Sequence, residues 1–356
     1  MRRKHLQYLS CPRCSQRLVL TAANDISKDD RVRTGTLECL DCHSTYPIEE
    51  FIPRFVPKRN YAASFGYQWN VHSLTQLDSK NGTTISRDRF FHESRWPENL
   101  RNEIILEVGC GSGRFTEIAA ETGATVVAFD YSSAVDANYR SNGHRDNVLL
   151  VQANLYEMPF WVNTFDRLFC FGVLQHTPDV WKSVLAMYRF LKPGASIAAD
   201  VYRKGVSHFR TFYAIRPLSR RIPHRLLYSI SKVYVLLMWR VTGWMARLLG
   251  SNTISWYLLV ADYRGVLPLD DRQLKEFAVL DTFDLLSPIH DHPQTFESIE
   301  TFFRNAGFDH IEIEAGFNGI DIRAKAPSET QTPSVAANLT CQPSTTIYHD
   351  RLNRSE

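Results

Sequence analysis

This 356-residue sequence lacks three features that assign proteins to broad classes. No uncharged stretch reaches the roughly 18 residues of a membrane span, and the most apolar segment, residues 233–249, contains Arg240 and Arg247. Residues 1–6 are basic but do not lead into the apolar core of a signal peptide. A net charge of +3 is too small by itself to indicate a nucleic-acid-binding protein. These absences predict a globular protein of the reducing cytoplasm.

A disulfide framework is also missing, although the chain has seven cysteines. Four of them form two C-x2-C pairs separated by 24 residues, namely Cys11, Cys14, Cys39 and Cys42. Two such pairs can complete a tetrahedral thiolate site around Zn²⁺ and leave no open position, so we predict a structural zinc ion in a ribbon of residues 1–58. The gap exceeds the usual spacing of roughly 15–20 residues, which a hairpin around residues 27–30 would accommodate. Free cysteines are the alternative, and we expect His43 on the surface.

Strands and helices alternate from residue 103 onward. Five apolar runs predict strands at 104–108, 125–129, 148–152, 167–171 and 196–201, with helices at 114–121 and 180–191. After an interruption, a helix at 295–305 and an alternating pair at 310–314 and 320–324 predict a terminal hairpin. We therefore predict an α/β fold: a Rossmann-like, doubly wound, mostly parallel seven-stranded sheet with a C-terminal antiparallel hairpin.

This pattern divides the chain into six predicted parts. They are the ribbon (1–58), an aromatic lid or linker (59–100), a cofactor-binding core (101–202), a helical cap (203–290), the closing helix and hairpin (291–325), and a disordered tail (326–356). The tail prediction rests on its Ser, Thr, Pro, Gln and Asn content and its few large apolar residues.

A glycine-rich turn follows the first predicted strand, with Gly109, Gly111 and Gly113 in a G-x-G-x-G pattern. Glycines allow such a turn and let a ligand approach the backbone closely. Arg114 stands where a dinucleotide fingerprint needs a small residue, which argues against a dehydrogenase site. Asp130 ends the second predicted strand, where a carboxylate can accept hydrogen bonds from both hydroxyls of a ribose.

In this order and spacing, residues 101–201 resemble the class I methyltransferases that depend on S-adenosylmethionine (SAM), of the type 11 kind. The resemblance implies that the three glycines pack on the methionine part of SAM and that Asp130 holds its ribose. Asn154 would meet the adenine edge, although Asp is usual there. The implied cofactor-binding residues are Glu107, Gly109, Gly111, Gly113, Asp130, Tyr131, Asn154, Leu155 and Phe171.

The N-terminal segment resembles small zinc-ribbon proteins that partner translation- and RNA-related methyltransferases. In some bacterial methyltransferases such a ribbon precedes the catalytic domain, and a Tyr-Ala-x-Ser-Phe-Gly-x-Gln-Trp stretch follows, as at residues 61–69 here. The aromatic side chains of residues 65–69 then form either a lid over the cofactor or part of the core.

The predicted cap is cationic, because no Asp or Glu lies between Asp200 and Asp262 while ten Lys or Arg do. Such a surface suits an anionic membrane or a phosphate-bearing substrate, and a solvated structural face is the alternative. For peripheral contact with the inner membrane face through residues 203–250, we expect an arginine cluster and two shallow anchors: Arg216, Arg220, Arg221, Arg225, Trp239 and Trp244. The basic and aromatic mixture also fits single-stranded nucleic acid, but no RNA-binding module accompanies it.

Methyl transfer to a hydroxyl requires positioning and removal of a proton. His176, after the fourth predicted strand, is the first candidate base, and His290 and His292 beside Asp291 are the second. A structural histidine is the alternative reading. We expect a small molecule, saccharide or lipid-linked glycan as acceptor.

Two other functions remain: a nucleic-acid methyltransferase and a non-catalytic SAM-binding partner subunit. Residues 172–175 lack the Asn/Asp-Pro-Pro-aromatic motif of many RNA base methyltransferases, and the cofactor motif is retained. Both observations favour the small-molecule enzyme.

Overall fold

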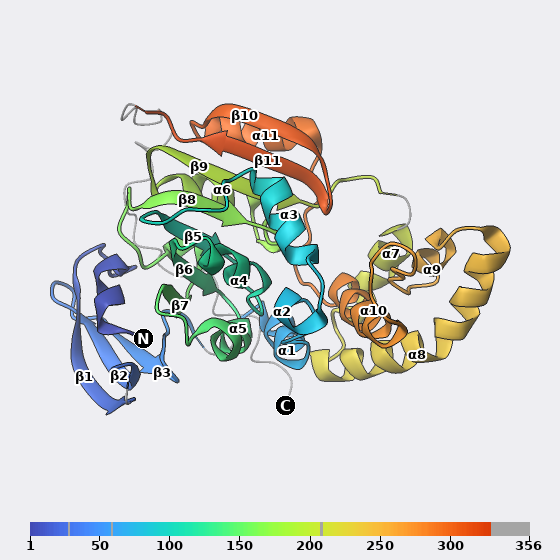
Figure 1. Ribbon diagram of the computed structural model, residues 1–356, viewed down its shortest axis with the longest axis horizontal. Coiled ribbons are helices and arrows are strands. Elements are labelled where there is room, and N and C mark those ends of the chain that lie inside the picture. Colours follow the sequence, from blue (N-terminus) through green and yellow to red (C-terminus); the bar gives the residue numbers. More distant parts are fainter. Residues whose placement is uncertain (28, 58–59, 207–208, 329–356) are drawn as a thin grey trace.

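A computed structural model describes residues 1–27, 29–57, 60–206 and 209–328. Its centre is a seven-stranded sheet of order β10-β11-β9-β8-β5-β6-β7 (Figure 1). The strands are β5 (Ile104–Val108), β6 (Thr125–Asp130), β7 (Val148–Gln152), β8 (Phe165–Cys170), β9 (Leu191–Val201), β10 (Asp309–Gly316) and β11 (Gly319–Lys325). The five strands from β7 to β9 are parallel, and β11 runs antiparallel to both β9 and β10. The predicted fold class, including the terminal hairpin, is therefore confirmed. Most of the predicted disordered tail lies outside the described residues.

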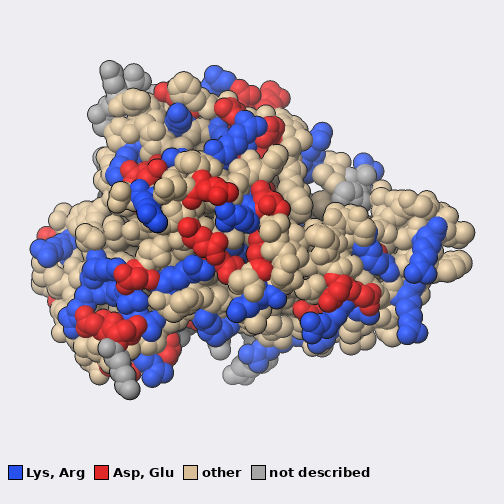
Figure 2. Space-filling model, in the orientation of Figure 1, with Lys and Arg blue, Asp and Glu red and all other residues tan. Residues whose placement is uncertain are grey.

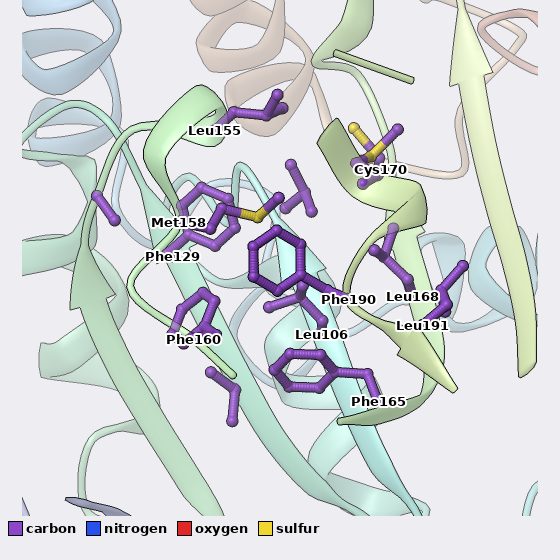
Figure 3. Close-up of a cluster of buried hydrophobic side chains, with 14 of the residues drawn as sticks. Leu106, Phe129, Leu155, Met158, Phe160, Phe165, Leu168, Cys170, Phe190 and Leu191 are labelled. Carbon is purple, nitrogen blue, oxygen red and sulfur yellow. The ribbon is translucent and has the colours of Figure 1, made fainter. Parts of the chain in front are cut away.

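Both faces of the parallel part of this sheet are buried, which explains why β5, β6 and β7 are largely apolar. Successive side chains of a strand point to opposite faces: Leu106 joins one buried cluster and Ile105 the other. On the first face lie α6 (Val180–Tyr188) and α11 (Phe296–Asn305), and on the second lie α3 (Ile85–Ser94), α4 (Arg114–Glu121) and α5 (Ala134–Asn142). Figure 3 shows part of the first cluster, where Phe160 and Phe165 pack near Leu106.

The structure corrects one boundary of the sheet. The predicted helix 180–191 ends at Tyr188, and β9 begins at Leu191 rather than at residue 196. Leu191 is opposite Phe165, whereas Ser196 is opposite Arg167, so the residues between them form a bulge. A bulge tolerates both the missing N–H of Pro193 and the positive φ of Gly194, +77°. Pro193 and Gly194, which predict a loop, therefore lie inside the bulge of strand β9.

The N-terminal region forms a separate antiparallel sheet of β1 (Leu18–Ile26), β2 (Val32–Cys39), β3 (Thr45–Glu49) and β4 (Ile52–Pro53), after the 3-10 helix η1 (Arg3–Tyr8). This sheet packs beside β7, where the Phe55 amide donates to the Gln152 carbonyl at 2.9 Å. Leu37 and Ile48 of the N-terminal sheet belong to the same buried cluster as Leu106. The two sheets therefore share one apolar core.

The cap forms the opposite end of the molecule from the N-terminal sheet (Figure 1). Its helices are α7 (Arg210–Ser219), α8 (His224–Leu249), α9 (Thr253–Tyr257) and α10 (Asp271–Leu286). They surround their own buried cluster, which includes Phe212, Val235 and Phe283. Helices α1 (Ala63–Val71) and α2 (Asp78–Asn81) follow the N-terminal sheet in the chain, and the short 3-10 helices η2 (Leu155–Glu157) and η3 (Leu174–His176) follow β7 and β8. None of the helices in the described ranges combines the length and apolar character that crossing a bilayer requires.

Two residues proposed from the sequence as membrane contacts are buried, and that part of the prediction is wrong. Trp239 is 4% exposed, and its indole N–H donates to Asp271 at 2.8 Å. Arg216 is 7% exposed, donates to the Leu285 carbonyl at 2.8 Å and forms an ion pair with Asp291. Both side chains hold the cap together.

Candidate functional site

A cavity of about 550 Å³ lies between the carboxyl ends of the parallel strands and the cap. Its lining contains seven of the residues selected from the sequence: Gly109, Gly111, Asp130, Tyr131, Leu155, Phe171 and His176. Five others do not line it: Glu107, Gly113, Asn154, His290 and His292. Open α/β sheets bind ligands at this rim, so the cavity is the candidate active site.

The glycine turn between β5 and α4 forms one wall of the cavity. Gly109 has φ +75°, and a Cβ there would lie 2.4 Å from Val173 Cγ2. Gly111 has φ +49°, and its Cβ would point toward the Trp69 ring, 3.5 Å away. Residues other than glycine are disfavoured at both positions. Without side chains there, the backbone of the turn faces the cavity directly.

Gly113, the third glycine of the motif, has another role. Its φ is +94°, and a Cβ would approach Asn138 Oδ1 to 2.3 Å. The absence of a side chain therefore allows α4 to pack closely against α5.

Asp130 stands at the end of β6, beside the glycine turn. Its Oδ2 accepts a hydrogen bond from the Gly111 amide at 2.9 Å, and its Oδ1 accepts from the amide and hydroxyl of Ser132 at 2.8 and 2.7 Å. Burial raises the pKa of Asp130, and these hydrogen bonds oppose the rise. Each carboxylate oxygen can accept further bonds, so the group is fixed in orientation and still able to hold a ligand's hydroxyls.

Glu107 and Asn154 have other partners. Glu107 is buried and accepts a hydrogen bond from the Thr116 hydroxyl; burial raises its pKa to about 8. Asn154 caps η2, where its side-chain oxygen accepts from the Tyr156 amide at 3.1 Å. Asn154 is the residue expected at the adenine edge, and its side-chain oxygen is thus already partly engaged. Its neighbour Leu155 does line the cavity.

His176 lies on η3, beyond β8, with its ring held in a defined orientation. Its Nδ1 is 3.2 Å from the His290 carbonyl oxygen. A carbonyl only accepts, so Nδ1 carries the hydrogen and Nε2 of the neutral ring has the free lone pair. The ring also contacts Phe65 and Tyr202, with centroids 4.9 and 5.4 Å apart.

His290 and His292 lie behind this residue. His290 contributes its carbonyl, and burial lowers the pKa of its side chain. The His292 amide donates to the Gln175 carbonyl at 2.7 Å. These two histidines therefore fix the loop that carries His176.

The opposite wall includes side chains that the sequence did not predict, most of them from the cap. Asp281 and Asp284 of α10 line the cavity with Tyr263 and Tyr202. The Tyr263 hydroxyl donates to Asp281 at 2.5 Å, and Gln68 Nε2 donates to Asp284 at 3.0 Å. Burial, with the nearby Asp284 charge, raises the pKa of Asp281 to about 7.

A local signal could have identified these two carboxylates. They stand three residues apart in the mostly apolar second half of α10, so they lie on one face of a buried helix. Buried carboxylates are uncommon without a function or a partner.

The aromatic segment 65–69 contributes both to the cavity wall and to the core, the two alternatives that the sequence left open. Phe65 and Trp69 of α1 line the cavity near the glycine turn. Tyr67, between them, faces the cap, where it contacts the rings of His224 and Tyr228 at 5.2 and 5.5 Å. Alternate sides of one short helix therefore cover the cavity and pack the core.

The four paired cysteines gather at the far end of the molecule from the cap. Their sulfur atoms all lie within 4.8 Å of one another. Cys11 Sγ is 3.6 Å from Cys42 Sγ, and Cys14 Sγ is 3.4 Å from Cys39 Sγ. His43 is outside this group: its side chain is 77% exposed and pairs with Glu38. Four converging thiols can form a metal site.

Comparison with known proteins agrees with this architecture. The family model for a methyltransferase domain matches residues 106–199. A ubiquinone biosynthesis O-methyltransferase of Pseudomonas entomophila is 32% identical over 112 residues, which cover 28% of this chain and 44% of that protein. A demethylmenaquinone methyltransferase of Corynebacterium urealyticum is 31% identical over 203 residues, which cover 51% of this chain and 86% of that protein.

Among solved structures, phosphoethanolamine N-methyltransferase 2 of Haemonchus contortus in complex with SAM has a TM-score of 0.45 and 16% identity, covering 80% of this chain and 62% of that one. The chain thus spans less than half of the first relative and most of the second. With the matched domain model and the relative covered over most of its length, the chain belongs to the SAM-dependent methyltransferases.

Proposed function

We propose that this protein transfers a methyl group from SAM to a hydroxyl of a small-molecule acceptor held between the glycine turn and the cap. The observation that carries the proposal is that a single cavity has both a glycine-and-carboxylate wall and a wall with candidate proton acceptors. SAM is the methyl donor of the family to which the chain belongs.

The glycine wall fits the cofactor. Gly109 and Gly111 leave a space that side chains would fill, and we assign it to the methionine part of SAM. Asp130, already oriented by Gly111 and Ser132, would accept hydrogen bonds from the ribose hydroxyls. When bound, SAM supplies an electrophilic methyl group on a sulfonium.

The remaining cofactor residues divide into contacts and supports. Tyr131, Leu155 and Phe171 line the cavity and would contact the ligand. Glu107 and Gly113 support the turn from behind, through Thr116 and Asn138. Asn154 can still meet the adenine, either with the second lone pair of the oxygen that caps η2 or with its amide N–H groups. We therefore assign Glu107 and Gly113 to the support of the turn and not to direct contact with SAM.

We assign His176 as the base. An acceptor hydroxyl placed at Nε2 would lose its proton to that atom while Nδ1 stays bonded to the His290 carbonyl. His290 and His292 then act as positioning residues. Asp281 is the competing base, because a pKa of about 7 leaves much of it ionised at neutral pH.

The acceptor class follows from the mixed lining. Apolar side chains of the cap, including Trp256 and Leu267, stand beside Asp281 and Asp284. An apolar molecule with hydroxyl groups suits such a wall, as do a saccharide or lipid-linked glycan with an apolar portion. The names of the two relatives refer to ubiquinone biosynthesis and demethylmenaquinone, which fits a small-molecule acceptor.

We also propose that Cys11, Cys14, Cys39 and Cys42 hold a structural Zn²⁺. Tetrahedral thiolate coordination with Zn–S bonds of about 2.3 Å separates the sulfur atoms by about 3.8 Å. The sulfur separations of 3.4 and 3.6 Å are near that value. Four protein ligands leave no position for a substrate.

A methyl-transfer screen tests the function. The purified chain is incubated with SAM labelled at the methyl group and with separate glycan, lipid and RNA pools. We expect label in a lipid or glycan fraction and none with the Gly109→Ala variant. Label in RNA would make the acceptor class wrong. Binding of SAM without labelling of any pool would favour the non-catalytic partner subunit.

A further inference from the structure

Helix α8 exposes an apolar stripe that the described residues leave uncovered. Nine large apolar side chains of this helix are exposed: Leu226, Ile230, Val233, Leu236, Leu237, Val241, Trp244, Leu248 and Leu249. The most exposed are Leu237 at 71%, Leu248 at 70% and Trp244 at 65%. Most recur every three or four residues, so they form one stripe about 33 Å long.

This stripe lies on the opposite side of α8 from the side that packs against the other cap helices. Leu227, Val235 and Trp239 belong to the buried cluster and lie on the other helix face. The helix is therefore apolar on two sides, of which only one is needed for folding. Exposed apolar patches of this extent mark interaction surfaces.

Positive charge accompanies the stripe. Arg240 and Arg247 are exposed on α8 at one edge of the stripe, and the helix contains no Asp or Glu. Figure 2 shows basic side chains beside a broad uncharged surface at the end of the molecule that α8 forms. An apolar stripe with cations along its side is the pattern of helices that lie in the surface of an anionic bilayer.

We propose that α8 is a membrane-docking helix whose Leu237–Trp244–Leu248 stripe enters the interface of an anionic bilayer while Arg240 and Arg247 contact lipid headgroups. Charge complementarity favours this occupant over a second copy of the chain. Two α8 helices packed through their stripes would bring like charges together without a carboxylate from either helix. The same cap provides Trp256 and Leu267 to the cavity wall, so docking would hold that wall at the membrane.

The docking proposal does not depend on the chemistry in the cavity. Because the stripe faces away from the cap core, substitutions on it leave SAM affinity as a separate readout. Unchanged SAM affinity therefore distinguishes a docking defect from a failure of the proposed function or of folding.

Vesicle sedimentation of the full chain tests the proposal. Vesicles of phosphatidylcholine alone are compared with vesicles that also contain phosphatidylglycerol, at low and high salt. We expect binding to the anionic vesicles only, weakened by salt. Arg240→Gln with Arg247→Gln should lower the partition coefficient about thirty-fold. Leu237→Gln with Trp244→Gln should lower it about a hundred-fold.

Matched variants elsewhere provide the controls. Ile26→Gln with Val162→Gln removes two exposed apolar side chains outside the cap, and Lys182→Gln with Arg304→Gln removes two exposed charges. Both pairs should leave vesicle binding unchanged. Absent or salt-insensitive binding of the wild type would overturn the proposal. Self-association in sedimentation velocity that is lost with Leu237→Gln and Trp244→Gln would overturn it in favour of a protein interface.

Discussion

The two walls of the cavity are built by different means. On the sheet side, Gly109 and Gly111 present backbone, and the Asp130 carboxylate is fixed by hydrogen bonds from residues within the same two turns. On the cap side, Asp281 and Asp284 project from helix α10. Asp281 accepts from Tyr263 of the cap, and Asp284 accepts from Gln68, which is far away in the chain. The first wall is defined by backbone shape, and the second by side-chain chemistry.

This difference indicates how the two ligands are selected. A wall made of backbone tolerates few amino-acid substitutions, which suits a cofactor that is the same in all related enzymes. A side-chain wall can be altered by single substitutions without rebuilding the turn, which suits an acceptor that differs between related enzymes. We therefore expect changes in the sheet wall to abolish SAM binding and changes in the cap wall to affect the acceptor step.

The largest expected effect is that of Gly109→Ala. The new Cβ would lie 2.4 Å from Val173 in a backbone with φ +75°, so the turn must move away from the cofactor. Calorimetry should show SAM affinity reduced by more than about a hundredfold. Gly82→Ala is the matched control, since Gly82 has φ +74° with nothing within 4 Å of the new Cβ. If both variants bind SAM equally, the turn does not contact the cofactor.

His176→Gln tests the link between the walls. Gln can preserve a polar contact with the His290 carbonyl but cannot accept a proton at neutral pH. We expect turnover to fall about a hundredfold while SAM affinity stays unchanged. The measurement is single-turnover methyl transfer across pH. If this variant keeps full turnover, His176 is not the base, and Asp281 takes its place in the proposal.

Cys39→Ser should act on a third region and leave both walls intact. Loss of one of four thiolates should remove the zinc, which elemental analysis would detect as a fall from one equivalent to none. The melting temperature should also fall, because Leu37 and Ile48 share a core with the main sheet. Cys170→Ser, at a buried cysteine outside the cluster, should keep its zinc. A Cys39→Ser protein with full zinc would exclude the four-cysteine site.

The smallest effect concerns stability. The pKa of Asp281 is raised to about 7 in the folded protein, so the folded state keeps a proton that the unfolded state loses near pH 4. The free energy of unfolding should therefore fall as pH rises from 4 to 7. Asp281→Asn should remove this loss and stabilise the protein by about 2–4 kcal/mol at pH 8, but not at pH 4.

Urea unfolding at both pH values measures this difference. Asp271→Asn on the same helix is an opposite-sign control, because hydrogen bonds from Lys275 and Trp239 lower the pKa of Asp271. Its substitution should slightly destabilise the protein at pH 8. Equal stability of Asp281→Asn and the wild type at pH 8 would mean that Asp281 is not buried as a charge.

The sequence predicted the sheet wall because its signals are local. The glycine spacing, the strand ends at Val108 and Gln152 and the two cysteine pairs each lie within a few residues of the chain. The cap wall depends on contacts between segments more than 200 residues apart, as between Gln68 and Asp284. Composition cannot place those contacts.

The same limit explains the errors in the cap. α8 is apolar on two faces, so its sequence does not reveal which face packs against the core. Trp239 and Trp244 are five residues apart and end in opposite environments, one 4% and the other 65% exposed. Arg216 is buried only because Asp291 and the Leu285 carbonyl are brought to it by the fold.

SAM calorimetry on Asp130→Ala and Asp281→Asn, side by side, tests the two-wall arrangement most directly. Losing the charge-assisted bonds of Asp130 to the ribose should weaken SAM binding by about 2–4 kcal/mol. Asp281→Asn should bind SAM as the wild type does and raise the KM for the acceptor, because Asp281 lines the acceptor wall. Unchanged SAM affinity in Asp130→Ala, or an equal loss of affinity in both variants, would contradict the assignment of the cofactor to the sheet wall and the acceptor to the cap wall.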